Sequence, residues 1–219
     1  MADLTALFTE AHRRAISRAA ANAEGSTSGE IVPYVVGACD DYREVGWKAA
    51  VIGGLIGGGG GLTMHYLGGI WGGSLWFWFV LPTVALAFVG VLAGRFSDWF
   101  RRLLIGGGVL DLRARQRAET AFLEEEVFAT RDRTGILIFV ALFERRVVVM
   151  GDAGINQAVP DGAWEHVVAD LAAGIRARRP GEALEAAIAE CGRLLAEHKV
   201  EIRTDDTDEL PNELRIRDR

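Results

Sequence analysis

The sequence predicts an α/β protein, a small layered α/β sandwich that is interrupted by a two-helix transmembrane hairpin. Two observations lead to this prediction. Residues 49–94 form a stretch of 46 residues without any Asp, Glu, Lys or Arg in a chain of 219 residues. Runs of β-branched and aromatic residues at 30–36, 136–143 and 147–150 predict strands, and the longer segments between them have helical periodicity.

The uncharged stretch has the length of two membrane spans. A helix crosses the hydrocarbon core of a bilayer with about 20 apolar residues, so we expect spans over 47–64 and 75–94, joined by a turn over 65–74. The alternative is a buried helix of a soluble protein, which seldom exceeds about 20 residues without a charged face. The length therefore favours the membrane, and the lipid bilayer is the first predicted partner.

Glycines recur every fourth residue along the first span, at Gly53, Gly57 and Gly61. Small residues at this spacing allow helix backbones to approach closely in lipid. The glycine face could pack against the second span, or it could support self-association with a second copy of the chain. A glycine-rich linker is the alternative to both.

The basic residues near the hairpin lie at its outer ends, and the turn has none; they are Arg43, Lys48, Arg95, Arg101 and Arg102. Positive residues favour the cytoplasmic side of a membrane. The sequence therefore predicts a multi-pass membrane protein whose soluble domain is cytoplasmic. The N-terminus lacks the order of a cleaved signal peptide, so the first span would act as the membrane signal.

The remaining elements follow from periodicity. Helices are expected over about 3–23 and 110–130, and Pro160 and Pro180 precede two more. Pro33 places the strand over 30–36 at a sheet edge or a bulge, because proline cannot donate to a ladder. The strand over 136–143 is apolar on both faces and should be central.

Three smaller segments complete the prediction. Residues 96–104 have an apolar and a charged face, which is typical either of a helix in the membrane interface or of the frayed end of the second span. We expect residues 151–156 to be a loop and 199–219 to be a largely unstructured charged tail. The predicted domains are a discontinuous soluble α/β domain over 1–44 and 106–198, the hairpin with its interfacial helix over 45–105, and the tail over 199–219.

The candidate site is a cluster of carboxylates at strand ends. Asp40 and Asp41 follow the first strand, and Asp152 follows the third, whereas Asp132 precedes the central strand and should lie at the opposite end. Ligands of α/β sheets bind beyond strand ends, and converging carboxylates bind hard cations such as calcium or magnesium. The alternative is that Asp152 caps a turn while Asp40 and Asp41 are solvated.

Other classes of chemistry find no support in the sequence. The net charge of −6 and the lack of a basic domain argue against nucleic-acid binding. No familiar catalytic motif or organic-cofactor motif is present. Cys39 and Cys191 are far apart and fit neither a zinc spacing nor a disulfide framework, and Cys191 is expected in a helix core.

Several segments resemble the TPM domain family, which is named after a thylakoid lumen protein, a photosystem II protein and a worm acetylcholine-receptor modulator. They are TSGEIVPYVV, TRDRTGILIFVALFERRVVVMGDAGIN, the helix around Trp164, the helix at Gly192–Leu195 and DELPNEL. The chain looks most like bacterial membrane proteins that carry this domain around a membrane hairpin, which implies the bacterial inner membrane. The resemblance also implies an α/β sandwich and roles in assembly, repair or modulation of membrane complexes. Some relatives are described as acid phosphatases or calcium binders.

Two functions are therefore expected. The first is a membrane-anchored interaction module for a membrane-protein partner that the sequence does not name, with a divalent cation as an additional ligand. The second is a metal-assisted acid phosphatase, in which a metal would polarise a phosphate ester. The lack of a nucleophile or general-base motif favours the first, so the prediction leans away from an enzyme.

Overall fold

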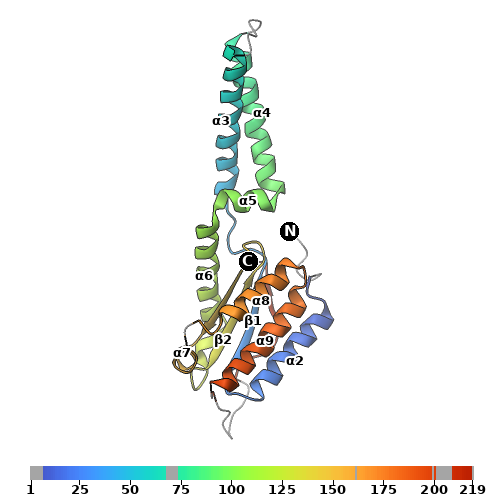
Figure 1. The fold of residues 1–219 in the computed structure, drawn as a ribbon, viewed down its shortest axis with the longest axis vertical. Helices are drawn as coiled ribbons and strands as arrows, with labels where there is room; N and C mark the ends of the chain where they lie inside the picture. Colours follow the sequence, from blue (N-terminus) through green and yellow to red (C-terminus); the bar gives the residue numbers. More distant parts are fainter. Residues whose placement is uncertain (1–6, 68–73, 161, 199, 201–208, 219) are drawn as a thin grey trace. The chain divides into compact units, whose positions relative to one another are not determined.

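The structure is a computed structural model that describes residues 7–67, 74–160, 162–198, 200 and 209–218. The chain divides into two compact units (Figure 1). We call Met1–Asp40 together with Asp111–Arg219 the sheet unit, and Asp41–Leu110 the hairpin unit. Each is described by itself.

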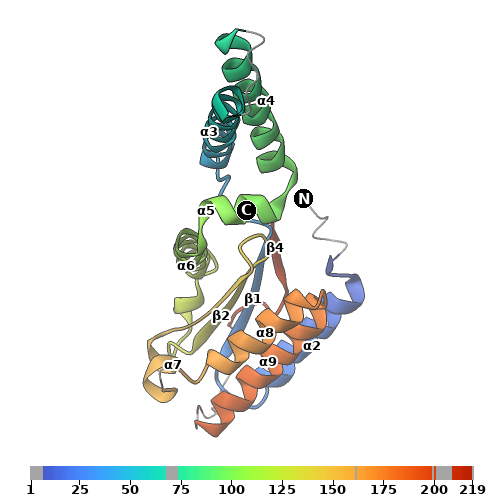
Figure 2. The same ribbon diagram turned by 45° about the horizontal axis from the view of Figure 1, so that its top comes forward.

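The sheet unit is built on a four-stranded sheet with the order β3-β2-β1-β4 (Figure 2). The strands are β1 (Glu30–Val36), β2 (Gly135–Ala141), β3 (Arg146–Gly151) and β4 (Arg215–Arg217). β1 is parallel to β2 and β4, whereas β3 returns antiparallel to β2. The α/β class predicted from the sequence is therefore confirmed, and β2 is central as expected.

Pro33 does not place β1 at the sheet edge, so that prediction is wrong. The Ile31 N–H donates to Glu24 and the Gly37 N–H to the Arg217 carbonyl, so odd-numbered groups of β1 face the β4 side. Pro33 shares that side, but β4 pairs with β1 only from Tyr34 onward. A residue without an N–H is therefore tolerated in a strand that is central over only part of its length.

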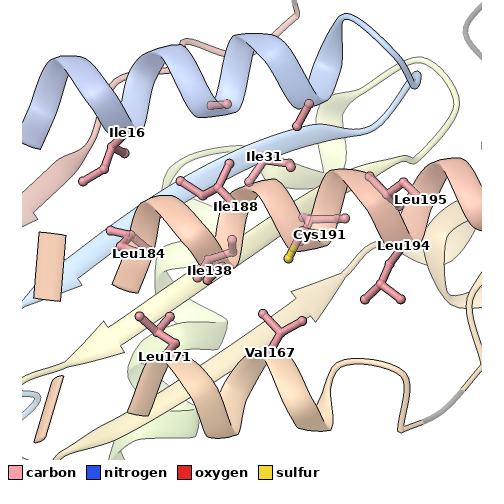
Figure 3. Packing of buried hydrophobic residues seen from close by; sticks show 14 of the residues in the cluster. Ile16, Ile31, Ile138, Val167, Leu171, Leu184, Ile188, Cys191, Leu194 and Leu195 are labelled. Carbon is pink, nitrogen blue, oxygen red and sulfur yellow. The ribbon is translucent and has the colours of Figure 1, made fainter. Parts of the chain in front are cut away.

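Helices cover both faces of the sheet (Figures 1 and 2). One face packs against α2 (Glu10–Glu24), α8 (Glu165–Arg176) and α9 (Pro180–Glu197), with Ile31, Val35 and Ile138 in that core. Figure 3 shows the side chains of this layer, in which Cys191 is a buried core residue as expected. The alternate residues of the same strands pack on the other face against α6 (Gly107–Glu124), mainly against its alanines Ala114, Ala118 and Ala121. Strands buried on both faces explain why β1 and β2 lack polar alternation.

Several element boundaries differ from the prediction. The helix expected over 110–130 ends at Glu124 because Glu126 has a left-handed backbone, and the 3-10 turn η1 (Val127–Ala129) follows. The expected loop after β3 contains a short helix, α7 (Ala153–Ala158), which begins where the Asp152 side chain caps the Ala153 N–H. The helix expected from Pro160 begins only at Glu165.

The charged tail is partly structured, so the expectation of an unstructured segment is wrong for residues 209–218. β4 forms parallel pairs with β1, and the Arg215 Nε lies 3.0 Å from the Glu125 Oε2. Short polar strands carry little hydrophobic signal, and this one is held by backbone and ion-pair contacts that sequence periodicity does not reveal.

The hairpin unit consists of α3 (Glu44–Leu67) and α4 (Leu75–Phe96), followed by α5 (Asp98–Ile105). α3 extends through His65, which was expected in the turn, and residues 68–73 lie outside the described part. The two helices pack closely through Gly53, Gly57 and Gly61: a Cβ at each would lie 2.1, 2.1 and 1.9 Å from the carbonyl oxygens of Leu86, Pro82 and Trp78, respectively.

One of the described helices, Trp76–Phe96, is long and apolar enough to cross a membrane, and none of its apolar window is buried. By length and composition this helix is a candidate membrane span, and it is the one candidate among the described residues, so the predicted hairpin of two spans is not confirmed. α5 is a helix of its own rather than the frayed end of α4, because Ser97 is extended and its Oγ accepts the Phe100 N–H at 3.3 Å.

Candidate functional site

The strand register separates the three predicted carboxylates. The end of β3 at Gly151 pairs with the start of β2 at Ile136, because β3 runs antiparallel to β2. Asp152 therefore lies at the end of the sheet where β1 and β2 begin. Asp40 and Asp41 follow the opposite end, where β1 terminates. The expected convergence of the three residues is wrong, because an antiparallel β3 ends where β1 and β2 begin.

Asp152 stabilises the local structure where α7 begins. Its buried carboxylate accepts the Ala153 N–H at 2.7 Å and forms a two-point ion pair with Arg133, at 2.6 Å from Nε and 3.0 Å from Nη2. Asp132 belongs to the same end of the sheet and not to the opposite one. A Cβ on Gly154 would come within 2.5 Å of the Asp132 carbonyl oxygen, so only glycine allows the two backbone segments to lie this close. The turn-capping alternative considered for Asp152 is thus the one that the contacts support.

The end where β1 and β2 terminate holds a second group of polar side chains. The buried Glu144 accepts the backbone N–H of Cys39 at 2.8 Å, and Asp40 forms an ion pair with Arg113 of α6 at 3.2 Å. Ligands bind beyond this end in many parallel sheets, so it is the better-placed candidate site. Burial, and then the charge of Glu144, raise the pKa of the Cys39 thiol well above its usual range. Cys39 is therefore a protonated thiol and a poor nucleophile.

Arginines complete this group. The Arg117 Nη2 donates to the Tyr34 hydroxyl at 2.8 Å, and its Nη1 lies 3.0 Å from Glu124. Arg146 of β3 pairs with Asp111 at the start of the sheet unit's second segment. Asp40 and Asp111 are the residues at which the chain leaves and re-enters the sheet unit, and both are held by arginines. The charged side chains at this end of the sheet are thus paired with one another, and they fix the positions of Asp40 and Asp111.

Metal-ligand geometry is not evident in this arrangement. Within the described ranges, no group of three or more His, Cys, Asp or Glu side chains is placed to hold a metal ion. Calcium or magnesium binding by Asp40, Asp41 and Asp152 therefore stays a prediction. Because Asp152 lies at the other end of the sheet, a single metal site would need additional ligands.

Sequence reasoning missed the residues whose side chains make the hydrogen bonds at the two ends of the sheet. Glu30 is buried, and its carboxylate accepts the N–H groups of Glu209 at 3.3 Å and Leu210 at 3.4 Å, which ties the C-terminal segment to the start of β1. Glu144 and Arg117 were also not predicted as site residues. A carboxylate next to an apolar strand, as at Glu30 and Glu144, is the signal that could have identified two of them.

The fold and this site define a layered α/β domain into which a helical hairpin is inserted. Residues 109–194 match the family model of the TPM domain, which confirms over these residues the resemblance predicted from the sequence. The matched segment includes β2 and β3 but not β1, which is supplied by the chain before the hairpin.

One solved structure supports the fold independently. The NMR structure of BA42 protein from the psychrophilic bacterium Bizionia argentinensis has a TM-score of 0.59 and 19% sequence identity, and the comparison covers 99% of each chain. At this identity the similarity concerns the fold alone. The search of curated proteins returns no match.

Proposed function

We propose that this protein is a membrane-anchored TPM-domain module that binds membrane-protein complexes, with α3 and α4 crossing the bacterial inner membrane as a hairpin. The observation that carries the proposal is the exposed apolar surface of the hairpin. Val84 and Phe88 of α4 are 61% and 63% exposed, and α3 exposes Leu55 and Ile56. A helix that is apolar all round and exposed requires lipid around it.

The close glycine contacts support a second span. α3 carries only Lys48 within its apolar part, near one end, where a lysine can extend toward the headgroups. Its glycine face meets α4, so in this proposal Gly53, Gly57 and Gly61 pack within the hairpin. Self-association through these glycines stays a prediction. Association with other proteins would then use the outer faces of the hairpin or the sheet unit.

Membrane extraction tests the anchor. Val84→Glu with Phe88→Glu places two charges on the exposed face of α4, and we expect this variant to leave the membrane in alkaline carbonate while the wild type stays. Leu123→Glu, at an exposed position of α6, is the matched control and should stay with the membrane. Release of the wild-type protein would contradict the anchor.

The orientation is tested by protease. The positive ends of the hairpin place the sheet unit in the cytoplasm in this proposal. Protease added to intact spheroplasts should leave the sheet unit whole and should digest it after lysis. Digestion in intact spheroplasts would reverse the proposed orientation.

Binding to complexes requires its own measurement. Cross-linking in cells should join the wild-type protein to integral membrane proteins, and the released Val84→Glu, Phe88→Glu variant should lose these products. The same products from both proteins would show that the anchor does not bring the module to its partners.

A metal-assisted acid phosphatase is the second candidate, taken from the resemblance. Since Asp40 and Asp152 lie at opposite sheet ends, single variants can locate an activity. The measurement is hydrolysis of a phosphate ester with calcium or magnesium. If this activity is lost in Asp40→Asn alone, the active site lies where β1 ends. If it is lost in Asp152→Asn alone, the active site lies where α7 begins. If the wild type hydrolyses no phosphate ester, the phosphatase is ruled out and the binding module is the proposal that remains.

A further inference from the structure

α5 has an apolar face that nothing in the described structure covers. Trp99 is 68% exposed and Leu103 is 60% exposed, and Phe96 just before α5 is 78% exposed. At 100° per residue, Trp99 and Leu103 lie on one side of α5, whereas Asp98, Arg101 and Arg102 lie on the other. The helix runs across the base of the hairpin instead of continuing α4 (Figures 1 and 2).

The position of this face suggests what covers it. α5 starts one residue after α4, which is the helix that is long and apolar enough to span a membrane. A helix that leaves a span at the interface and turns across it can bury its apolar face among the upper acyl chains. Tryptophan is enriched at this depth, because its ring is apolar and its N–H remains near water.

Charge complements an anionic surface at the same place. Residues 41–110 contain five Lys and Arg and three Asp and Glu, a net charge of +2. The whole chain carries −6, so the remaining residues carry −8. An anionic bilayer thus attracts the hairpin unit, whose charges all lie near its base, and repels the sheet unit.

A cavity of about 300 Å³ opens at the base of the hairpin. Val45, Val91, Arg95 and Arg101 are among its lining residues, and Arg101 also pairs with Asp98 at 3.6 Å. Asp41 also lines the cavity, so a phosphate would bind on the side of the two arginines. Guanidinium groups hold phosphate by paired, charge-assisted hydrogen bonds.

We infer that α5 is an in-plane membrane helix that selects anionic phospholipid, with its apolar face among the acyl chains and with Arg95 and Arg101 binding the headgroup phosphate. This inference rests on the proposed membrane hairpin. It adds anionic phospholipid as the partner that the base of the hairpin recognises.

Quenching of tryptophan fluorescence by brominated lipids tests both points in the full-length protein reconstituted into bilayers. The contribution of Trp99 is the difference between the wild type and Trp99→Phe. The contribution of Trp76, at the start of α4, is the difference between the wild type and Trp76→Phe. Quenching of both residues is expected if α4 is inserted and α5 lies in the interface.

Lipid selectivity is measured with brominated phosphatidylglycerol and brominated phosphatidylcholine at the same mole fraction. We expect the anionic lipid to quench Trp99 at least about twofold more strongly, since each basic residue near an anionic surface favours binding severalfold. Arg95→Gln with Arg101→Gln should bring the ratio close to one, as should high salt. Arg14→Gln with Arg18→Gln, on exposed positions of α2, is the matched control and should keep the preference.

The outcomes separate this inference from the proposed function. If Trp76 is quenched and Trp99 is not, the hairpin stands and the in-plane helix is wrong, and the face of α5 is covered by protein instead. If both are quenched equally by the two lipids, the anionic selectivity is wrong. If neither is quenched, the membrane hairpin and this inference both fail.

Discussion

At the scale of single residues, buried glutamates connect separate segments of the sheet unit, and those bound by Glu30 and Glu144 lie far from them in the sequence. Glu24 accepts the Ile31 N–H at 2.9 Å, Glu30 accepts two N–H groups of the C-terminal segment, and Glu144 accepts the Cys39 N–H. A buried carboxylate is stable only when hydrogen bonds replace the water that it loses. These acids therefore position strand ends, and they were not the acids that the sequence pattern emphasised.

Glu190 on the outer helical layer provides a test by pH. Arg193 and then His166 donate to its carboxylate, which lowers its pKa from 4.5 to about 2. A carboxylate whose pKa is lowered by folding stabilises the protein above its unfolded pKa, and this contribution is lost as the pH falls from 4.5 toward 2.

We expect Glu190→Gln to lower the melting temperature near pH 6 and to approach the wild type near pH 2. The effect should be small, below about 1 kcal/mol, because these side chains are partly exposed and screened by solvent. Glu185→Gln, elsewhere on α9, is the control. A difference between Glu190→Gln and the wild type that stays constant across this range would show that the carboxylate charge contributes nothing.

At the scale of elements, β4 and α3 are both held by contacts outside their own sequence. β4 has three residues, too few for a periodic signal, and it is positioned by β1 and by Glu125. α3 contains a run of glycines that would weaken an isolated helix, but these glycines allow α4 to approach. In both cases the neighbour decides the structure.

Arg215 is the residue that we expect to hold β4 in place. Its side chain is 11% exposed and pairs with Glu125, which is 18% exposed, and its Nη1 donates to the Glu213 carbonyl at 2.7 Å. Arg215→Ala should lower the free energy of unfolding by about 2 kcal/mol, because it leaves a largely buried carboxylate without this partner. Chemical denaturation measures the loss. Arg115→Ala, at an exposed position of α6, is the control, and equal effects of the two variants would contradict the role of β4.

The packing of the hairpin can be tested with an engineered disulfide. A Cβ built on Gly54 lies 3.8 Å from the Ala87 Cβ, which equals the mean separation of about 3.8 Å in disulfides. Gly54→Cys with Ala87→Cys should therefore cross-link under a membrane-permeable oxidant, as measured by gel mobility after proteolysis in the turn.

Further substitutions show whether the glycine contacts are needed. Gly57→Leu should greatly reduce cross-linking, because its side chain would meet the Pro82 carbonyl. Gly59→Leu should leave it intact, because a Cβ there meets nothing within 4 Å. Equal cross-linking in the two variants would show that α3 and α4 do not pack through Gly57.

At the scale of the whole molecule, the chain divides its tasks between the two units. All buried residues of both hydrophobic cores belong to the sheet unit, although this unit is made from two separate segments. The hairpin unit contributes none of them. The insertion is therefore compatible with a sheet unit whose core is complete without it.

Replacing residues 41–110 by a short Gly-Ser linker tests this independence. The linker need span little distance, because the Asp40 carboxylate already lies 3.2 Å from the Arg113 guanidinium. We expect a protein that remains monomeric without detergent and melts cooperatively, as measured by size-exclusion chromatography and circular dichroism. Aggregation, or loss of the cooperative transition, would show that the sheet unit needs the hairpin.

The sequence by itself determined the α/β class, the central position of β2, the helical layers and the apolar segment, because each depends on a hydrophobic pattern that is local in the chain. The run over 136–143 lacks polar alternation because β2 is buried on both faces, and Cys191 lies on the apolar stripe of its helix. The resemblance of the segments around β2 to the TPM domain likewise follows from the sequence alone.

Only the tertiary structure decided the role of Pro33, the order of the C-terminal segment and the partners of the carboxylates. These depend on which groups meet across long stretches of chain, and a local hydrophobic pattern carries no information about such contacts. One antiparallel strand was enough to separate Asp152 from Asp40. The local pattern thus determined what is buried, and the contacts between distant segments decided which polar groups share an end of the sheet.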